Sequence, residues 1–489
     1  MKSYWAIVKL TFRNALRSHI FQLLLLLLLL AVIVIPTTVS GDGTAGGFIR
    51  VSLLYSLSTV SFILALSSVW LGCHAMTQDI DNYQLHMVVT KPVSRIKIWL
   101  AKWTGVYLVH LILLLAATMA IYFIILYKYN QQDFPQSERE KIRNEVMVGR
   151  RVFWPEKTDY EAASRELVKE RINRLRARGQ EVDSSPSTQE AMLKEARRDV
   201  VTSDSELEFD RPKEYQFKGL PADLDKPLFL RYRPYVGKVA SEGQRMTRSM
   251  WIAGIPRVAE KKPAANVFEQ EQKERYEYYP QPLSEFPEQV MSGEFHEKVL
   301  PASWKVIAPD QTVRFIYVNA DDMQEKQYFQ PIDGPKLLVE VSGFFENYMR
   351  SVAIVALELL ILCGLGCAFG GILTLPTAIF VAVSYLMFGS FAVYMTNLSY
   401  VAGTADHIGQ FIAKVLLLVV IPVQAFEVSG LVANGEIVEL AYFWMLFKSY
   451  FIYRALPLFL LGMILYRRRE LGLVIRKLVN SEPLSCISR

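Results

Sequence analysis

The sequence predicts an α-helical polytopic membrane protein with six transmembrane helices and an α+β, β-sandwich-like domain between the third and fourth helices. Three observations indicate this class. Of the 489 residues, 52% are hydrophobic, and they concentrate in residues 1–129 and 348–466. Residues 130–347 have the composition of a soluble domain. Lys and Arg collect at alternate ends of the apolar segments, as they do in multi-pass proteins.

Five parts are expected along the chain. Residues 1–19 are expected to form an amphipathic interfacial helix, and residues 20–129 to contain transmembrane helices 1–3 with a cytoplasmic helix at 77–98. Residues 130–347 are expected to form an extracytoplasmic domain. Residues 348–466 would contain transmembrane helices 4–6 with a re-entrant segment near 408–430, and residues 467–489 a basic cytoplasmic tail.

The helices are predicted from apolar length. A hydrocarbon core about 30 Å thick needs roughly 20 apolar residues in a helix that rises about 1.5 Å per residue. Six segments qualify: Phe21–Val39, Val51–Cys73, Trp103–Leu126, Ser351–Phe369, Ala378–Leu398 and Ser449–Tyr466. The stretch from Ile408 to Ile421 is shorter, contains Lys414 and stops at Pro422, which favours a re-entrant or interfacial segment. Counting it as a crossing would give seven.

The distribution of basic residues decides between six and seven spans. The basic residues form three groups: Lys2, Lys9, Arg13 and Arg17; Lys91, Arg95, Lys97 and Lys102; and Arg467, Arg468, Arg469, Arg476 and Lys477. Six spans place all three groups in the cytoplasm with both termini, and residues 130–347 outside.

A cleaved signal peptide is the alternative for the first span. No small-residue cleavage site follows it, and five further spans need an entry point.

Residues 2–19 have the pattern of an amphipathic helix. Lys9, Arg13 and Arg17 recur every four residues, and apolar side chains occupy much of the other side: Trp5, Val8, Phe12 and Leu16. Such a helix lies among lipid headgroups with its bases toward anionic lipid, so membrane lipid is an expected partner. A plain topological anchor is the compatible alternative.

The loop from Thr77 to Lys102 is the most informative stretch. Asp79 and Asp81 are expected to open a short helix, where acids suit the positive end of the dipole. Apolar residues from Leu85 to Val89 give it one apolar side, and Pro92 ends it. An amphipathic helix on the cytoplasmic face is suited to docking in a partner's groove.

With Lys91-Pro92-Val93-Ser94-Arg95 followed by Lys102, this loop resembles the permease subunits of exporter-type (type-2) ABC transporters. The turn Gly370–Pro376 and the Arg-Arg-Arg-Glu-Leu segment after the last span are also similar. The resemblance covers about residues 1–127 and 348–477, although the family more often has Glu where this chain has Asp79 and Asp81.

The resemblance implies a transport subunit in the plasma (inner) membrane, with a second permease subunit, identical or not, and a separate ABC ATPase subunit. It implies these ATPase-coupling residues: Asp79, Asp81, Gln84, Lys91, Pro92, Arg95 and Pro376. ATP would be bound by the partner, because no G-x-x-x-x-G-K-[ST] motif occurs here. We expect no cofactor, metal, nucleic-acid partner or enzymatic activity of the chain itself. A membrane-anchored receptor or scaffold and a polytopic enzyme are the alternative classes.

Two polar residues lie inside predicted spans. His110 is about two turns into the third span, and Glu358 lies near the middle of the fourth. Because a charged group at this depth is costly, it usually faces protein or water. We hypothesise that the two pair or line one polar path. Satisfied structural contacts or a neutral Glu are the alternative.

The domain at 130–347 is expected to begin with helices and continue as strands. Capping boxes at Thr158/Glu161 and Ser187/Glu190 predict two helix starts, and Gly179 ends the first helix. Five strands are predicted: Leu228–Tyr232, Met250–Ile252, Glu294–Val299, Thr312–Val318 and Lys336–Val341. A set of aromatic residues fits either a sugar or lipid headgroup or core packing: Trp251, Tyr276, Tyr278, Tyr279 and Trp304. The domain contains no cysteine, so no disulfide holds it.

Overall fold

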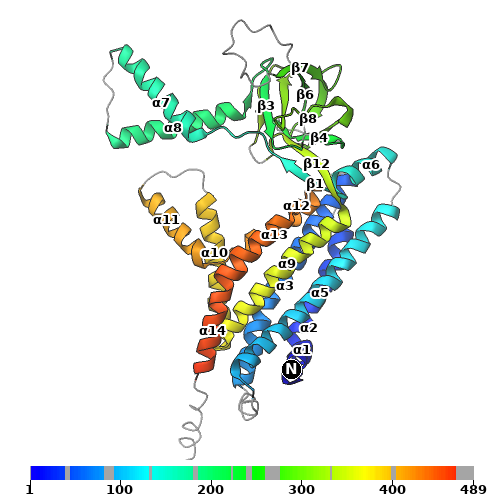
Figure 1. Cartoon of the computed structure of the whole chain (residues 1–489), viewed down its shortest axis with the longest axis vertical. Helices are drawn as coiled ribbons and strands as arrows, with labels where there is room; N and C mark the ends of the chain where they lie inside the picture. Colours follow the sequence, from blue (N-terminus) through cyan, green and yellow to red (C-terminus); the bar gives the residue numbers. More distant parts are fainter. Residues whose placement is uncertain are drawn as a thin grey trace, which may run out of the picture. The chain divides into compact units, whose positions relative to one another are not determined.

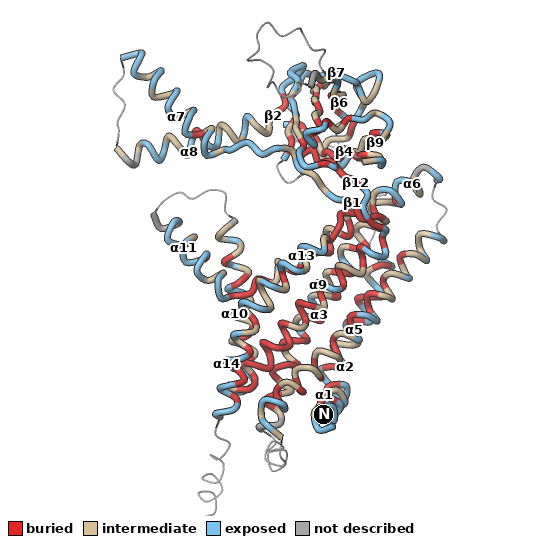
Figure 2. The backbone as a smooth tube through the Cα atoms, viewed as in Figure 1, coloured by how far each residue is buried: buried red, intermediate tan, exposed pale blue. Residues whose placement is uncertain are grey.

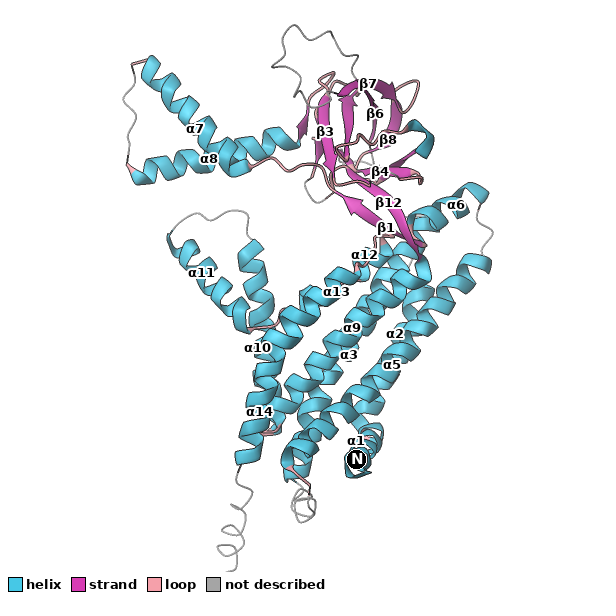
Figure 3. Ribbon diagram, in the orientation of Figure 1, coloured by secondary structure: helices cyan, strands magenta, loops and turns pink. Residues whose placement is uncertain are grey.

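The computed structural model describes residues 2–38, 45–81, 93–131, 135–179, 185–221, 224–237, 245–258, 276–330, 333–397 and 404–469. The chain divides into a helical unit, residues 1–149 and 342–489, and a β unit, residues 150–341. The strands, magenta in Figure 3, gather in the β unit. The β unit is shorter than the predicted domain at 130–347, because helix α6 (Gln136–Glu145) and the start of α9 belong to the helical unit.

Among its described residues, the helical unit contains six helices long and apolar enough to cross a membrane, the hallmark of a multi-pass membrane protein. Their apolar parts are Phe21–Thr38, Gly46–Gln78, Arg95–Asn130, Phe344–Gly370, Leu375–Thr396 and Leu440–Arg468. The helices (Figure 1) are α1 Lys2–Arg17, α2 His19–Thr38, α3 Ala45–Asp81, α5 Arg95–Gln131, α9 Phe344–Gly370, α10 Leu375–Asn397, α11 Thr404–Val419, α12 Ser429–Ala433, α13 Leu440–Leu446 and α14 Leu456–Arg468. A short 3₁₀ turn, η3 (Val423–Phe426), precedes α12, and a π-helical segment, η4 (Phe447–Ala455), joins α13 to α14.

Helix α9 is the centre of the helical unit. Of its apolar stretch 78% is buried, against 22% for α10, as the red tube in Figure 2 shows. Its glycines allow α3 to approach closely: a Cβ at Gly370 would lie 2.5 Å from the Cys73 carbonyl oxygen, and one at Gly366 2.7 Å from that of Val69. Small residues permit such backbone contact, which drives helix association where burial from water contributes little.

The ends of α3 and α5 differ from the sequence prediction. Helix α3 continues to Asp81, so Asp79 and Asp81 end this helix instead of opening another, and that prediction was wrong. The apolar pattern stops near Cys73, but no Gly or Pro that could stop the helix itself follows before Pro92. Helix α5 begins at Arg95, well before the expected Trp103. Residues 82–92 of the predicted cytoplasmic helix at 77–98 lie outside the described residues.

The segment near 408–430 is broken. Helix α11 and the η3–α12 stretch are bent by 59° at the break that contains Pro422. Last-turn carbonyls of a helix lack intrahelical partners. Here Tyr385 donates to the carbonyl of Val419 (2.8 Å) and Arg454 to that of Val420 (3.1 Å).

Hydrogen bonds also show which way the later helices run. Arg469, after α14, donates to the carbonyl of Gly371 after α9 (3.0 Å), while Asn347 near the start of α9 donates to Glu436 before α13 (2.8 Å). Helix α10 leaves from the Gly371 end, and α13–α14 returns to it. The segment between them therefore starts and finishes at the same end of the helical unit, which favours the predicted re-entrant segment over a seventh crossing.

After strand β1 (Val148–Phe153), the chain forms two packed helices, α7 (Tyr160–Ala177) and α8 (Pro186–Ser205). The N-caps are Asp159 and Ser185, not the predicted Thr158 and Ser187. The Asp159 carboxylate accepts from the amides of Glu161 and Ala162, both at 3.1 Å, and an acidic cap also suits the helix dipole. In α8 the first helical residue is Pro186, whose fixed φ suits that position.

The strands form three sheets, and the pairings whose register is described are antiparallel. The first has the order β1 (Val148–Phe153), β12 (Lys336–Gly343), β4 (Leu228–Tyr232), β9 (His296–Leu300). The second has the order β3 (Lys213–Lys218), β10 (Thr312–Asn319), β6 (Met246–Val258), β7 (Tyr276–Pro282), and β8 (Glu288–Met291) also pairs with β6. The third has the order β2 (Glu206–Leu207), β11 (Gln327–Phe329), β5 (Pro234–Val236).

All three sheets contribute to one core, as expected for a sandwich-like domain. Trp251 lies at its centre, with its ring centroid 4.8 Å from that of Tyr317 and 6.1 Å from that of Phe329. Core packing is thus the correct interpretation for Trp251, whereas Tyr279 is exposed beneath the guanidinium of Arg257. The five predicted strands are present, and seven further strands were missed because most are short or polar on one face.

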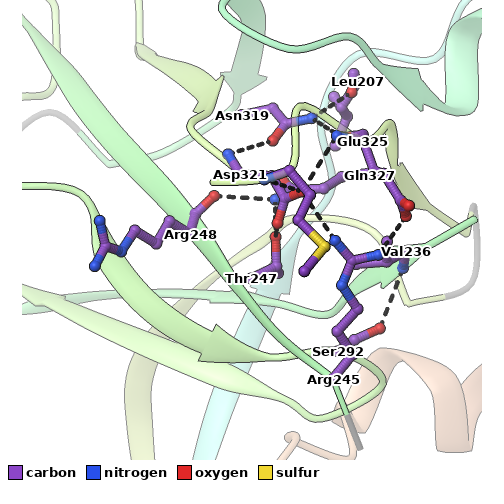
Figure 4. A network of polar contacts seen from close by, with 11 residues as sticks. Leu207, Val236, Arg245, Thr247, Arg248, Ser292, Asn319, Asp321, Glu325 and Gln327 are labelled. Atoms are coloured by element: carbon purple, nitrogen blue, oxygen red, sulfur yellow. Dashed lines mark hydrogen bonds and ion pairs between the residues drawn. The ribbon is translucent and has the colours of Figure 1, made fainter. Parts of the chain in front are cut away.

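Buried charges in the β unit are paired. Glu297 bonds both Arg150 (2.6 Å) and Arg231 (3.0 Å), which are themselves buried. Around Asp321, Arg245 and Thr247 donate to its two oxygens at 3.1 and 2.7 Å, and Gln327 donates to Thr247 at 2.6 Å (Figure 4). This network fixes the turn between β10 and β11, so we assign it a structural role.

Candidate functional site

The basic segments of the helical unit meet at one end of it. Arg95, the first residue of α5, donates from Nη1 to the carbonyl oxygens of Arg467 (3.0 Å) and Arg469 (2.7 Å) at the end of α14. Arg469 in turn donates to the carbonyl of Gly371 in the turn between α9 and α10 (3.0 Å). We call Arg95, Arg469 and Gly371 the arginine cluster.

The arginine cluster satisfies helix ends. The last carbonyls of α14 and α9 have no intrahelical partner and carry the negative end of the helix dipole. Guanidinium groups supply both the donors and the opposite charge. One helical turn further into α5, Trp99 is fully buried and donates to the carbonyl of Cys367 (3.3 Å), and Lys102 donates to that of Ala75. The start of α5 is therefore attached to the ends of α3, α9 and α14.

The predicted coupling residues are only partly described. Arg95 lies in the arginine cluster, and Pro376 is the exposed second residue of α10, in the turn that Gly371 opens. Asp79 and Asp81 lie in the last turn of α3, but their side chains are outside the described residues. Gln84, Lys91 and Pro92 lie outside the described residues altogether. Arg469 was predicted as a topological charge and as part of the Arg-Arg-Arg-Glu-Leu segment that resembles the family, but not as a coupling residue.

Helix α1 lies against this same end. The Tyr4 hydroxyl is 2.6 Å from that of Thr104 on α5, and Gly105 lets α5 approach Thr11 closely. The buried residues of α1 are Val8, Thr11 and Ala15, while Trp5 and Leu16 stay exposed. Lys9, Arg13 and Arg17 are exposed as well. An outward apolar set beside basic residues is what the predicted contact with lipid headgroups requires.

His110 and Glu358 do not pair. The fully buried ring of His110 lies 3.0 Å from Ser67 Oγ and 2.9 Å from the Val106 carbonyl oxygen, so both nitrogens have partners. Cys363 Sγ lies 3.9 Å from Nδ1. The alternative, a satisfied structural contact, is therefore the correct interpretation for His110, and the hypothesis of a pair was wrong.

Glu358 instead faces a cavity of about 90 Å³ between α3, α5, α9 and the η3–α12 segment. Its side chain is 5% exposed, and no donor to its carboxyl group is found in the part of the chain that the structure describes. The cavity is also lined by polar residues from three other segments: Ser58, Ser61, Thr118, Glu427 and Ser429. A second carboxyl group, missed from sequence, thus lies at the same cavity. The sequence feature that could have identified Glu427 is its position just after the break at Pro422.

No family model, no curated protein and no solved structure matches this chain.

Proposed function

We propose that this chain is the permease subunit of an ATP-driven transporter of the exporter (type-2) ABC class. The observation that carries the proposal is the arginine cluster. It hydrogen-bonds the start of α5 to the turn before α10 through the end of α14. These are the two segments that, by resemblance, contact the ATPase.

The proposed orientation has six crossings, with both termini cytoplasmic and residues 130–347 extracytoplasmic. It is supported by the gathering of three basic segments at one end of the helical unit: helix α1, the start of α5 and the end of α14. Lys and Arg favour the cytoplasmic side in multi-pass proteins. The plasma membrane is the proposed location.

The proposed mechanism is alternating access driven by a separate ATPase subunit, in a dimer of permease subunits. A partner moves the permease only if its two nucleotide states contact the permease differently. The start of α5 is a suitable lever, because Arg95, Trp99 and Lys102 attach it to α14, α9 and α3. A displacement of this one helix end is passed to three others.

Copurification with an ABC ATPase tests the proposal. The full chain and an ATPase encoded beside it are coexpressed, and the ATPase recovered with the tagged chain is measured. We expect Arg95→Ala to lower recovery at least tenfold. Arg350→Ala is the matched control, since Arg350 also donates to a backbone carbonyl, that of Val438, at the opposite end of the helical unit (3.5 Å). Absence of any ATPase partner would favour the receptor or scaffold alternative.

A further inference from the structure

The cavity at Glu358 contains more negative charge than its described surroundings balance. Glu358 lies in the middle of α9, about 21 Å from its first residue at about 1.5 Å per residue. An ionised carboxyl group at such depth is costly without a partner. Every titratable or basic side chain that lines the cavity is a glutamate, Glu358 or Glu427, as far as the structure describes the lining.

The two carboxyl groups are held differently. Glu427 accepts from the amide (3.2 Å) and the hydroxyl of Ser429, and Ser58 Oγ lies 3.3 Å away. All of these contacts are to Oε1. Glu358, by contrast, has none of these donors, although it is far more deeply buried. Glu358 is therefore the carboxyl group that lacks a partner, and one positive charge bound beside it would compensate its charge.

The cavity is suited to a small cation. Carboxylate and hydroxyl oxygens are hard ligands, which hold alkali and alkaline-earth ions or accept from an ammonium group. A volume of about 90 Å³ exceeds the space that one water molecule needs several-fold, so an ion with part of its hydration shell fits. Glu427 is exposed and lies at the same cavity, which offers an entry route.

We infer that this cavity is a binding site for a small monovalent cation, either a free alkali ion or the ammonium group of a larger molecule, held between Glu358 and Glu427. The hydroxyl groups of Ser58 and Ser61 complete the oxygen ligands. The inference goes beyond the proposed function and does not depend on it, because binding is measured on the permease chain without an ATPase.

The test uses the full chain in lipid nanodiscs. The midpoint of thermal unfolding is followed as NaCl, KCl or methylammonium chloride replaces choline chloride at constant ionic strength and pH. Wild type should show a saturable rise, because a ligand that binds only the folded state stabilises it. A stronger response to Na⁺ or K⁺ identifies a free ion as the ligand, and a stronger response to methylammonium identifies an ammonium group.

Three variants localise the site. Glu358→Gln should abolish the response, and Glu427→Gln should weaken the apparent affinity at least tenfold. Glu346→Gln, an exposed carboxylate on the same helix that pairs with Arg350, should leave it unchanged. If Glu358→Gln does not fold, the change in apparent cation affinity in Glu427→Gln decides whether the cavity is the binding site.

Two results would overturn the inference. In the first, the wild-type chain responds to none of the three cations, or is stabilised only when the pH is lowered. Either outcome would mean that Glu358 is a neutral carboxyl group. The second is an unchanged affinity in Glu427→Gln or a retained response in Glu358→Gln.

Discussion

Buried polar groups find different kinds of hydrogen-bonding partner in the two units of this protein. In the β unit a buried carboxylate is matched by side-chain cations, as Glu297 is by Arg150 and Arg231. In the helical unit, buried donors instead reach backbone carbonyls of neighbouring helices, as Trp103 does to Leu360 (3.0 Å) and Tyr348 to Thr118 (2.7 Å). Glu358, whose carboxyl group has no described donor, departs from both patterns.

The difference has a physical reason. A β domain in water is stabilised by burying apolar surface, and it tolerates buried ions when each is paired. Apolar helices surrounded by lipid gain little from further burial, so close backbone contact and interhelical hydrogen bonds hold them together. A feature that contributes to neither kind of stability is a good candidate for function, and Glu358 is such a feature.

The largest expected effect comes from the paired charges of the β unit. Glu297→Gln weakens the bonds to two buried guanidinium groups and should lower the free energy of unfolding of this unit by about 3–5 kcal/mol. Urea titration of the full chain, followed by tryptophan fluorescence, measures this. Glu214→Gln, which removes the partly exposed pair with Arg314, should cost no more than about 1 kcal/mol. Equal effects in the two variants would contradict the importance of buried pairing.

A smaller effect is expected where α9 meets α3. Gly370→Ala places a Cβ against the backbone of Cys73 and should destabilise the helical unit by about 1–3 kcal/mol, although alanine favours helices. Gly430→Ala is the control, because nothing lies within 4 Å of its added Cβ. Unfolding in SDS measures both variants. If Gly370→Ala left the stability of the helical unit unchanged, the two helices would separate easily, which would contradict the close packing described.

The smallest effect concerns pH and the α7–α8 pair. Burial, and then the hydrogen bond to Asp204 (2.7 Å), raise the pKa of Tyr160 to about 12. Because the folded-state pKa lies above the ordinary value of about 10, this contribution is complete below pH 10 and is lost as pH rises toward 12. Thermal unfolding between pH 9 and 12 should show a loss of stability that Tyr160→Phe lacks. An identical pH profile in the variant would show that Tyr160 does not contribute.

Sequence patterns predicted the coarse architecture because hydropathy depends on composition over many residues. The six apolar helices follow from apolar length, and the break follows from a short apolar stretch that stops at Pro422. Details that depend on single hydrogen bonds were not predictable: Asp159 as the cap of α7, and Asp79 and Asp81 at the end of α3 instead of a new helix.

The candidate sites were harder to predict than the fold because they join distant residues. Glu358 stood out as a carboxyl group within an apolar segment, but His110 was the wrong partner. Glu427 lies 69 residues further along the chain (427 − 358), in an irregular segment that gives no periodic signal. Arg95 was singled out by resemblance, whereas its contact with the end of α14 needed the folded helices.

The most direct test of the account is the side of the membrane on which each part lies. Lys97→Cys on α5 and Lys326→Cys in the β unit are each placed in a chain whose native cysteines are replaced by serine, and are labelled in intact cells with a membrane-impermeant maleimide. We predict that Lys326→Cys is labelled at once and Lys97→Cys only after permeabilisation. Labelling of both positions from the same side would contradict the proposed orientation, and with it a cytoplasmic arginine cluster that an ATPase can reach.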